Sequence, residues 1–147
     1  MLKGYLLLVC QSASVDVNSG APSFFNLVER VTIVPYQPEH PVALETHAYF
    51  EVSAEDVGQV IETRLVWQSA NGSTWRSGRT VPIKPIVGKV PVRIRVQTLA
   101  LPPTPGDYHI FVEGRRAEDT PWECISPAIP LSLLTEADQP LPSQTSA

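Results

Sequence analysis

The chain has 147 residues, of which 43% are hydrophobic and 18% charged, and this composition is typical of a folded globular domain rather than a disordered segment. Its 11 basic and 15 acidic side chains give a formal net charge of −4, so the sequence provides no basic field to neutralise phosphates. We therefore expect no binding to nucleic acid or to anionic membranes. Its 15 prolines and 8 glycines, spread between short apolar runs, exclude most long helices and favour strands joined by turns.

The first predicted element covers residues 3–14, where the apolar run from Tyr5 to Val9 follows Lys3. This run is shorter than the roughly 7 to 15 apolar residues of a signal peptide, and Val9 stands where cleavage needs a small residue. We interpret the segment as a strand that is apolar on both faces and is therefore covered on both sides, by its own domain or by another protein. No later segment approaches the roughly 18 apolar residues of a membrane span, so we expect a soluble, cytoplasmic protein.

The rest of the chain alternates between strand patterns and turn-forming residues. Strands are predicted at residues 26–36, 42–53, 59–69, 75–83, 89–99, 107–115 and 122–134. We expect an all-β fold, a two-sheet antiparallel β-sandwich of immunoglobulin-like type with about eight strands and little or no helix. One domain is expected over residues 1–134, and the polar residues 135–147 are expected to form a flexible tail.

Alternation assigns faces to three of the strands. The segment 42–53 places Val42, Leu44, Ala48, Phe50 and Val52 inward, and Glu45, His47, Tyr49 and Glu51 outward. The segment 89–99 places Val90, Val92, Ile94 and Val96 inward, with Arg93 and Arg95 outward. The segment 107–115 places Tyr108, Ile110 and Val112 inward, with His109 and Phe111 outward. We expect 89–99 and 107–115 to pair as a hairpin, and we expect Asn71-Gly72 to form a type I′ turn.

The residues that might carry chemistry match no known motif. His40, His47 and His109 are the only histidines, and we expect them to be exposed and non-catalytic, so no enzyme is predicted. Glu45, His47, Tyr49 and Glu51 share a strand face, but their spacing makes a line, and a second strand would have to complete a tetrahedral set. We therefore expect no metal and no cofactor. Cys10 and Cys124 are predicted to be buried, reduced thiols.

Two blocks of the chain carry a recognisable pattern: the first runs from Leu7 to Asp16 and continues from Phe24 to Val31, and the second comprises Val92 to Val96 and Pro105 to Val112. Together they resemble a family of small uncharacterised bacterial proteins. The resemblance implies a bacterial β-sandwich domain of unknown function and carries over no catalytic residue. Gln11 departs from the pattern, because an aspartate is expected after the cysteine. The Pro-Gly-Asp-Tyr turn before Tyr108 also resembles the strand-opening tyrosine of immunoglobulin-like sandwiches.

Two hypotheses for function follow from these patterns. The first is a non-enzymatic interaction or assembly module that contacts another protein or a second copy of itself, with a surface formed by Tyr5, Leu7, Val9, Arg93, Arg95, His109 and Phe111. The alternative is a small-ligand or carbohydrate-binding domain that uses Trp75, Trp122, His47 and Tyr49. A hydrolase is the third possibility and would require a histidine paired with a second histidine or a carboxylate in a cleft. Trp67 is expected in the core, because alternation along the strand 59–69 places it on the same face as Ile61 and Leu65.

Overall fold

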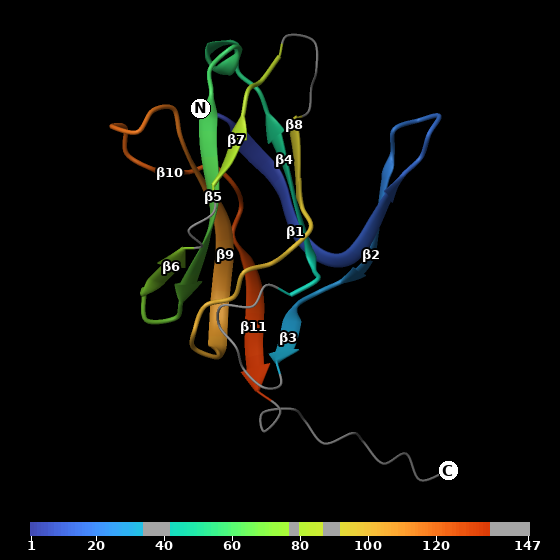
Figure 1. The fold of residues 1–147 in the computed structure, drawn as a ribbon, viewed down its shortest axis with the longest axis vertical. Helices are drawn as coiled ribbons and strands as arrows, with labels where there is room; N and C mark the ends of the chain where they lie inside the picture. Colours follow the sequence, from blue (N-terminus) through green and yellow to red (C-terminus); the bar gives the residue numbers. More distant parts are fainter. Residues whose placement is uncertain (34–41, 77–79, 87–91, 136–147) are drawn as a thin grey trace.

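The structure is a computed structural model that describes residues 1–33, 42–76, 80–86 and 92–135. The described residues form two β-sheets, with a single short 3-10 turn, η1 (Ala54–Asp56). The predicted all-β, predominantly antiparallel sandwich is therefore confirmed. Figure 1 shows the arrangement of the strands.

Sheet A has four strands in the order β2-β1-β4-β8. Its members are β1 (Lys3–Val15), β2 (Pro22–Leu27), β4 (Glu45–Glu51) and β8 (Val92–Val96). All three pairings in this sheet are antiparallel. The first half of β1 pairs with β4 and its second half pairs with β2, and Cys10 belongs to both ladders because it faces Glu45 on one side and Leu27 on the other.

Sheet B has seven strands, with β3-β11-β9-β5-β6 in order and two short strands added to it. The members of the main path are β3 (Arg30–Ile33), β5 (Ile61–Ser69), β6 (Thr74–Arg76), β9 (Gly106–Arg115) and β11 (Ile129–Thr135). The short strands are β7 (Val81–Ile83), which pairs with β5, and β10 (Glu123–Cys124), which pairs with β9. Only the pairing of β3 with β11 is parallel among these described strands.

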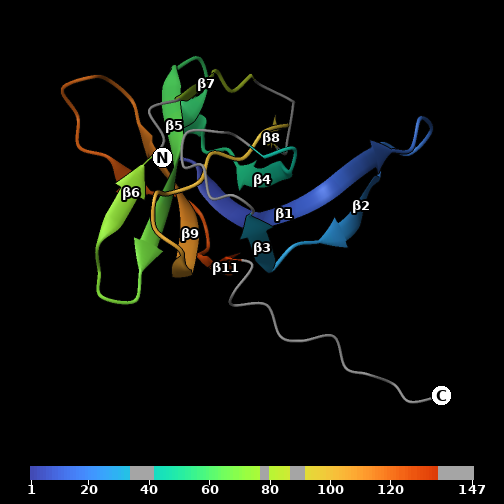
Figure 2. The same cartoon turned by 60° about the horizontal axis from the view of Figure 1, so that its bottom comes forward.

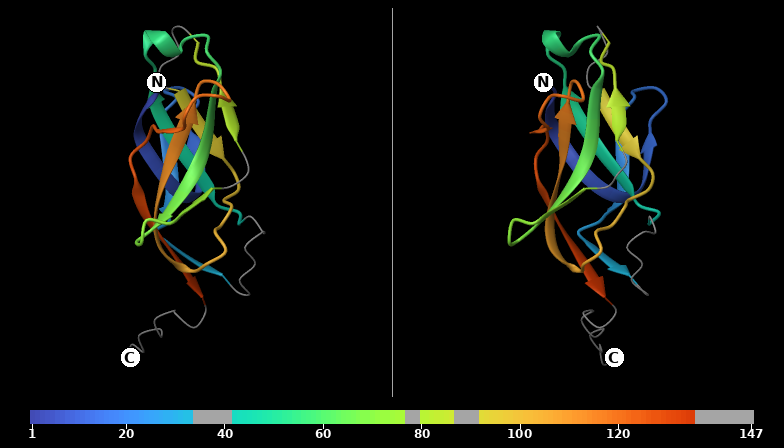
Figure 3. Two further views of the ribbon diagram at one scale, coloured as in Figure 1. Left: turned by 90° about the vertical axis from the view of Figure 1, so that its left-hand side faces the viewer. Right: turned by 60° about the vertical axis from the view of Figure 1, so that its left-hand side comes forward.

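The apolar core fills the space between the two sheets, which cross one another in Figure 3. Phe50 of β4 and Trp67 of β5 are both fully buried, as their phase in the sequence predicts. Tyr108 closes one end of the core, because its hydroxyl donates a hydrogen bond to the backbone oxygen of Thr104. This arrangement resembles the tyrosine corner of some β-sandwiches, in which a tyrosine near the start of a strand bonds to backbone a few residues upstream.

A hairpin arm, residues 11–27, projects from one side of the body in Figures 1 and 2. The arm comprises the distal half of β1, a turn and β2. It is not detached from the rest of sheet A, because Arg93 of β8 donates a hydrogen bond of 3.2 Å to the backbone oxygen of Gly20 in the turn. The arm therefore spans the outer face of β4, which separates β1 from β8.

The predicted pairing of 89–99 with 107–115 is wrong. β8 belongs to sheet A and pairs with β4, whereas β9 belongs to sheet B and pairs with β5 and β11. The connecting residues contain Pro102, Pro103 and Pro105, and this stretch carries the chain from one sheet to the other rather than back along the same sheet. Adjacency in sequence was therefore a poor guide to pairing here.

The turn at Asn71-Gly72 also differs from the prediction. Only Gly72 adopts a positive φ, of 87°, and its N–H bonds to the oxygen of Ser69. A type I′ turn needs positive φ at two consecutive residues, so this loop is instead the three-residue hairpin connection with glycine in the left-handed region. The predicted strand 75–83 corresponds to β6 and β7, with residues 77–79 outside the described residues, and the predicted strand 122–134 is divided into β10 and β11. The predicted strand 26–36 covers the end of β2 and all of β3. Residues 34–36 of that prediction lie outside the described residues.

Candidate functional site

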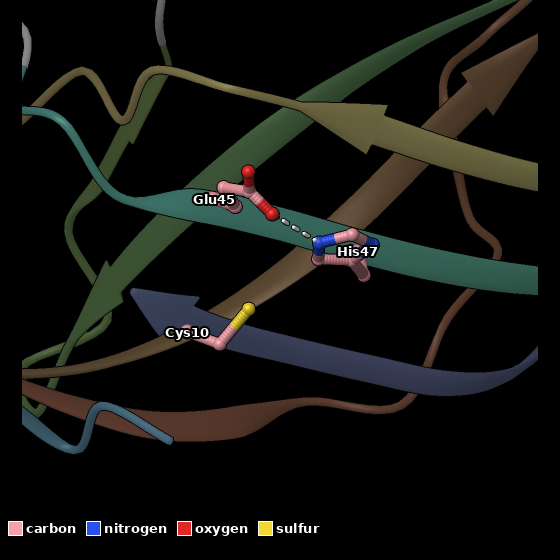
Figure 4. A group of neighbouring side chains, drawn as sticks. All are labelled: Cys10, Glu45 and His47. Atoms are coloured by element: carbon pink, nitrogen blue, oxygen red, sulfur yellow. Dashed lines mark hydrogen bonds and ion pairs between the residues drawn. The ribbon is translucent and has the colours of Figure 1, made fainter. Parts of the chain in front are cut away.

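A cluster of three chemically active side chains lies where β1 meets β4 (Figure 4). Cys10 comes from β1, and Glu45 and His47 are alternate residues on β4. One donor atom of each side chain, the Sγ, a carboxylate oxygen and a ring nitrogen, lies within 4.8 Å of the other two. All three residues are buried, with exposed fractions of 0% for Cys10, 8% for Glu45 and 5% for His47.

Burial of this cluster overturns the prediction that His47 and Tyr49 face solvent. The phase of β4 was assigned correctly, since Ala48 and Phe50 face the core, but the opposite face is covered as well. The ring of Phe24, which belongs to the arm, lies 5.0 Å from the ring of His47 in an edge-on contact, and it also packs against Tyr49. The arm thus encloses a polar face that alternation alone marks as exposed.

The cluster is held by charged hydrogen bonds. Nε2 of His47 lies 2.9 Å from Oε2 of Glu45, and Arg95 of β8 donates to Oε1 of the same carboxylate. The hydrogen bonds from Arg95 and His47 hold the pKa of Glu45 below its ordinary value. Burial raises the pKa of the Cys10 thiol, and the neighbouring Glu45 carboxylate adds to that rise. Without a ligand, the cluster therefore contains an ionised carboxylate beside a protonated thiol.

This arrangement is better suited to holding a small occupant than to attacking a substrate. A thiol, an imidazole and a carboxylate can act together as nucleophile, base and orienting group. However, Nε2 of His47 is directed to Glu45, and the Cys10 side chain is fully buried, so its sulfur is not exposed to a bulky substrate in this conformation. The same three donor types are also ligands for transition metals.

A second feature is a cavity of about 340 Å³ between the two sheets, next to β7 and β8. Its walls are mostly apolar and include Leu65, Val81 and Ile94. Thr46 lines the cavity, and its hydroxyl is buried without a hydrogen-bond partner. Apolar walls with few polar groups are typical of sites for small molecules.

The residues predicted to form an interaction surface do not lie on one surface. Leu7 and Val9 are core residues, exposed by 4% and 1%, because the core-facing side of β1 packs between the sheets. Tyr5, Arg93 and Arg95 are exposed on sheet A. The last two predicted residues, His109 and Phe111, belong to β9 in sheet B, where His109 is exposed and Phe111 half-buried.

The residues predicted to contact a small ligand are also dispersed. Trp75 lines a shallow groove of about 500 Å³ beside the proline-rich residues 102–105. Trp122 is half-buried between two guanidinium groups, those of Arg64 at 3.8 Å and Arg115 at 4.5 Å from its ring centre. His47 and Tyr49 lie beneath the arm on the other sheet. The structure thus separates the four residues into three environments.

Both cysteines are free thiols, but only one matches its predicted environment. Cys10 is buried, as expected, whereas Cys124 is exposed because it lies in the short strand β10 at the edge of sheet B. The partnership of Cys10 with His47 was missed. The sequence did show a line of possible metal ligands on β4 that only a second strand could complete. Which strand lies beside β4 depends on pairing between distant segments, and the sequence pattern does not reveal that pairing.

Within the part of the chain that the structure describes, no helix is both long and apolar enough to cross a membrane. Comparisons with models of known protein families and with curated proteins find no match to this chain.

Proposed function

We propose that this chain is a non-enzymatic assembly module that associates with a second copy of itself through the free edge of β2. The observation that supports this proposal is the unprotected edge of the arm. Seven large apolar side chains are exposed in the described residues, and four of them, Val15, Val17, Phe25 and Leu27, belong to the arm. Exposed apolar groups gathered on one projecting element are typical of an interaction site.

The other edges of the two sheets are protected against pairing. An edge strand that carries a charged side chain or an internal proline resists pairing with another strand. The edge strand β8 contains Arg93 and Arg95, and β7 has Pro82 at its centre. The remaining edges, in β3, β6 and β10, each contain a charged residue. Among the described edge strands, only β2 has neither feature: its sequence is PSFFNL, with proline only at its first position.

Pairing of two β2 strands is favoured over pairing with an unrelated charged surface. Antiparallel association about a two-fold axis places the same uncharged strand on both sides, so no charge is buried and no like charges meet. The unpaired backbone groups of β2 would find partners, and Phe25 and Leu27 would lose contact with water. A strand of six residues makes a small interface, so we expect a reversible dimer with a micromolar dissociation constant.

Light scattering at increasing protein concentration tests this proposal. The unmodified chain should shift from monomer toward dimer as concentration rises. Leu27→Lys places a charge at the last residue of the pairing strand, at a side chain that is 65% exposed, and should keep the protein monomeric. The matched control is Val60→Lys, which replaces another half-exposed apolar side chain outside the arm and should dimerise like the original. A chain that stays monomeric up to millimolar concentration would overturn the proposal.

The cavity supports a second candidate function, the binding of a small apolar ligand between the sheets. A ligand with one polar group would provide the hydroxyl of Thr46 with the partner that it lacks. The test is a screen of apolar fluorescent probes against the original chain and against Ala48→Leu, which fills part of the cavity wall. Probe binding that the larger side chain reduces would support this function, and equal binding by both proteins would count against it.

A further inference from the structure

We propose that Cys10, Glu45 and His47 form a binding site for a borderline-soft divalent metal ion such as Zn²⁺. The sequence offered only a line of donors on one strand, which cannot surround an ion. The pairing of β1 with β4 adds a thiol from a second strand, and the three donor atoms then lie within 4.8 Å of one another. This proposal does not depend on self-association of the chain.

The donor types select the kind of metal. A cysteine sulfur and a histidine nitrogen are preferred by Zn²⁺ and its neighbours in the transition series, whereas Mg²⁺ and Ca²⁺ require oxygen ligands. One sulfur, one nitrogen and one carboxylate oxygen also make three protein ligands. In zinc proteins a site with three protein ligands keeps its fourth position for water or another small ligand.

The charges of the site balance on metal binding. Cys10 binds as a thiolate and releases its proton to solvent, and Glu45 is already a carboxylate. His47 loses the Nε2 proton that it donates to Glu45 and binds as the neutral tautomer with its proton on Nδ1. The two charges of the protein ligands then match those of the divalent cation, and the positive charge of Arg95 lies on a side chain that is 45% exposed to solvent. Arg95 retains Oε1 of Glu45, so Oε2 is the oxygen available to the metal.

The donors need only a small adjustment to reach a tetrahedral geometry. With metal–ligand bonds of about 2.0–2.3 Å, the donors of a tetrahedral site are separated by about 3.3–3.8 Å. The ion replaces the hydrogen bond between His47 and Glu45, whose atoms must move from 2.9 Å to about 3.3 Å apart, and the widest separation, which is at most 4.8 Å, must close by about 1 Å. Rotation of the side chains is sufficient for such shifts.

The metal would tie the base of the arm to the body of sheet A. Cys10 lies where β1 leaves β4 and continues in the ladder with β2, so a bond from its sulfur to an ion on β4 crosses this junction. The ring of Phe24 shields His47 on the arm side. We infer that metal binding fixes the position of the arm relative to β4.

Titration of Co²⁺ into the Cys124→Ser variant tests the proposal directly. The chain contains two cysteines, so Cys10 is the only thiol left in this variant. The substitution affects an exposed residue and should not disturb the fold. We expect a thiolate-to-cobalt charge-transfer band in the near ultraviolet and intense visible absorption from a tetrahedral ion, both saturating at one equivalent. Excess Zn²⁺ should bleach both.

Two histidine variants in the same background identify the second ligand. His47→Gln should weaken Co²⁺ binding at least a hundredfold, whereas the matched control His109→Gln, at an exposed histidine on sheet B, should leave it unchanged. Circular dichroism verifies that each variant is folded. If His47→Gln does not fold, the imidazole ¹⁵N signals of the Cys124→Ser protein provide the same information, because Zn²⁺ should shift those of His47 and not those of His109.

The absence of a charge-transfer band in folded Cys124→Ser protein would overturn the proposal. A band that survives unchanged in folded His47→Gln protein would also overturn it, since the ion would then be held elsewhere.

Discussion

Replacing Gly4 with alanine should destabilise the fold more than its small size suggests. Gly4 lies in β1, where the backbone of sheet A touches the segment that precedes β11, and its N–H donates a hydrogen bond of 2.6 Å to the oxygen of Ile125. A Cβ atom at this position would lie 2.7 Å from that oxygen and 2.9 Å from Cα of Ser126. Both atoms belong to backbone, so no side chain can rotate away.

The size of the effect follows from these contacts. The two segments must separate by about 0.5 Å or more, and such overpacking costs about 1–3 kcal/mol. Loss of the hydrogen bond destabilises the protein by about a further 1 kcal/mol. Alanine also lowers the conformational entropy of the unfolded chain, and this effect offsets about 0.5–1 kcal/mol of the destabilisation. We expect a net loss of about 2 kcal/mol in the free energy of unfolding, which lowers the Tm by about 6 °C in a domain of this size.

Gly114→Ala is the matched control, because the two glycines flank the same isoleucine. A Cβ atom at Gly114 would lie 2.8 Å from Cδ1 of Ile125, and its next contacts are at 3.5 Å. A terminal methyl group can move by rotation, so we expect a change within about 1 kcal/mol. Urea unfolding followed by tryptophan fluorescence measures both variants. Equal losses, or a greater loss for Gly114→Ala, would refute the argument that backbone contact determines the cost.

Three further predictions concern buried polar groups. Thr46→Val removes a hydroxyl without a partner and should stabilise the protein by about 1 kcal/mol in urea unfolding, unless a bound ligand uses that hydroxyl. Burial alone would raise the pKa of Asp56, but hydrogen bonds from Ser53 and Arg116 outweigh it and hold the pKa below its ordinary value. Asp56 therefore contributes stability that is present above about pH 4 and is lost as the pH falls from there through the folded pKa, and Asp56→Asn should lose less stability than the original chain as the pH falls below about 4. Glu113→Ala leaves two arginine side chains of sheet B without their shared carboxylate and should cost about 2 kcal/mol by thermal unfolding, whereas no measurable loss would mean that solvent replaces the carboxylate fully.

The sequence predicted the strands and their phase well, because period-two alternation depends only on local chemistry. Trp67, Ala48 and Phe50 face the core as expected, and Arg93 and Arg95 remain exposed. The fold class follows from the same patterns, since short alternating segments between turn-forming residues have few other solutions.

Features that depend on contacts between distant segments escaped prediction. Alternation marks His47 as exposed, but alternation cannot show that a hairpin will curl over one face of its own sheet and bury it. For the same reason Cys10 appears in the sequence as an isolated apolar thiol. Its proximity to Glu45 is set by the register between β1 and β4, which the order of residues along either strand does not reveal.

The position of β11 within sheet B imposes an order on folding. This strand lies between β3 and β9, and its parallel register with β3 joins Ser132 to Arg30 across most of the sequence. During synthesis β3 emerges early and has no partner in the sheet until β11 arrives, and β9 presents an open edge for the same interval. Sheet B therefore cannot be completed as the chain emerges from the ribosome, and the chain remains exposed to aggregation until its last described strand is made.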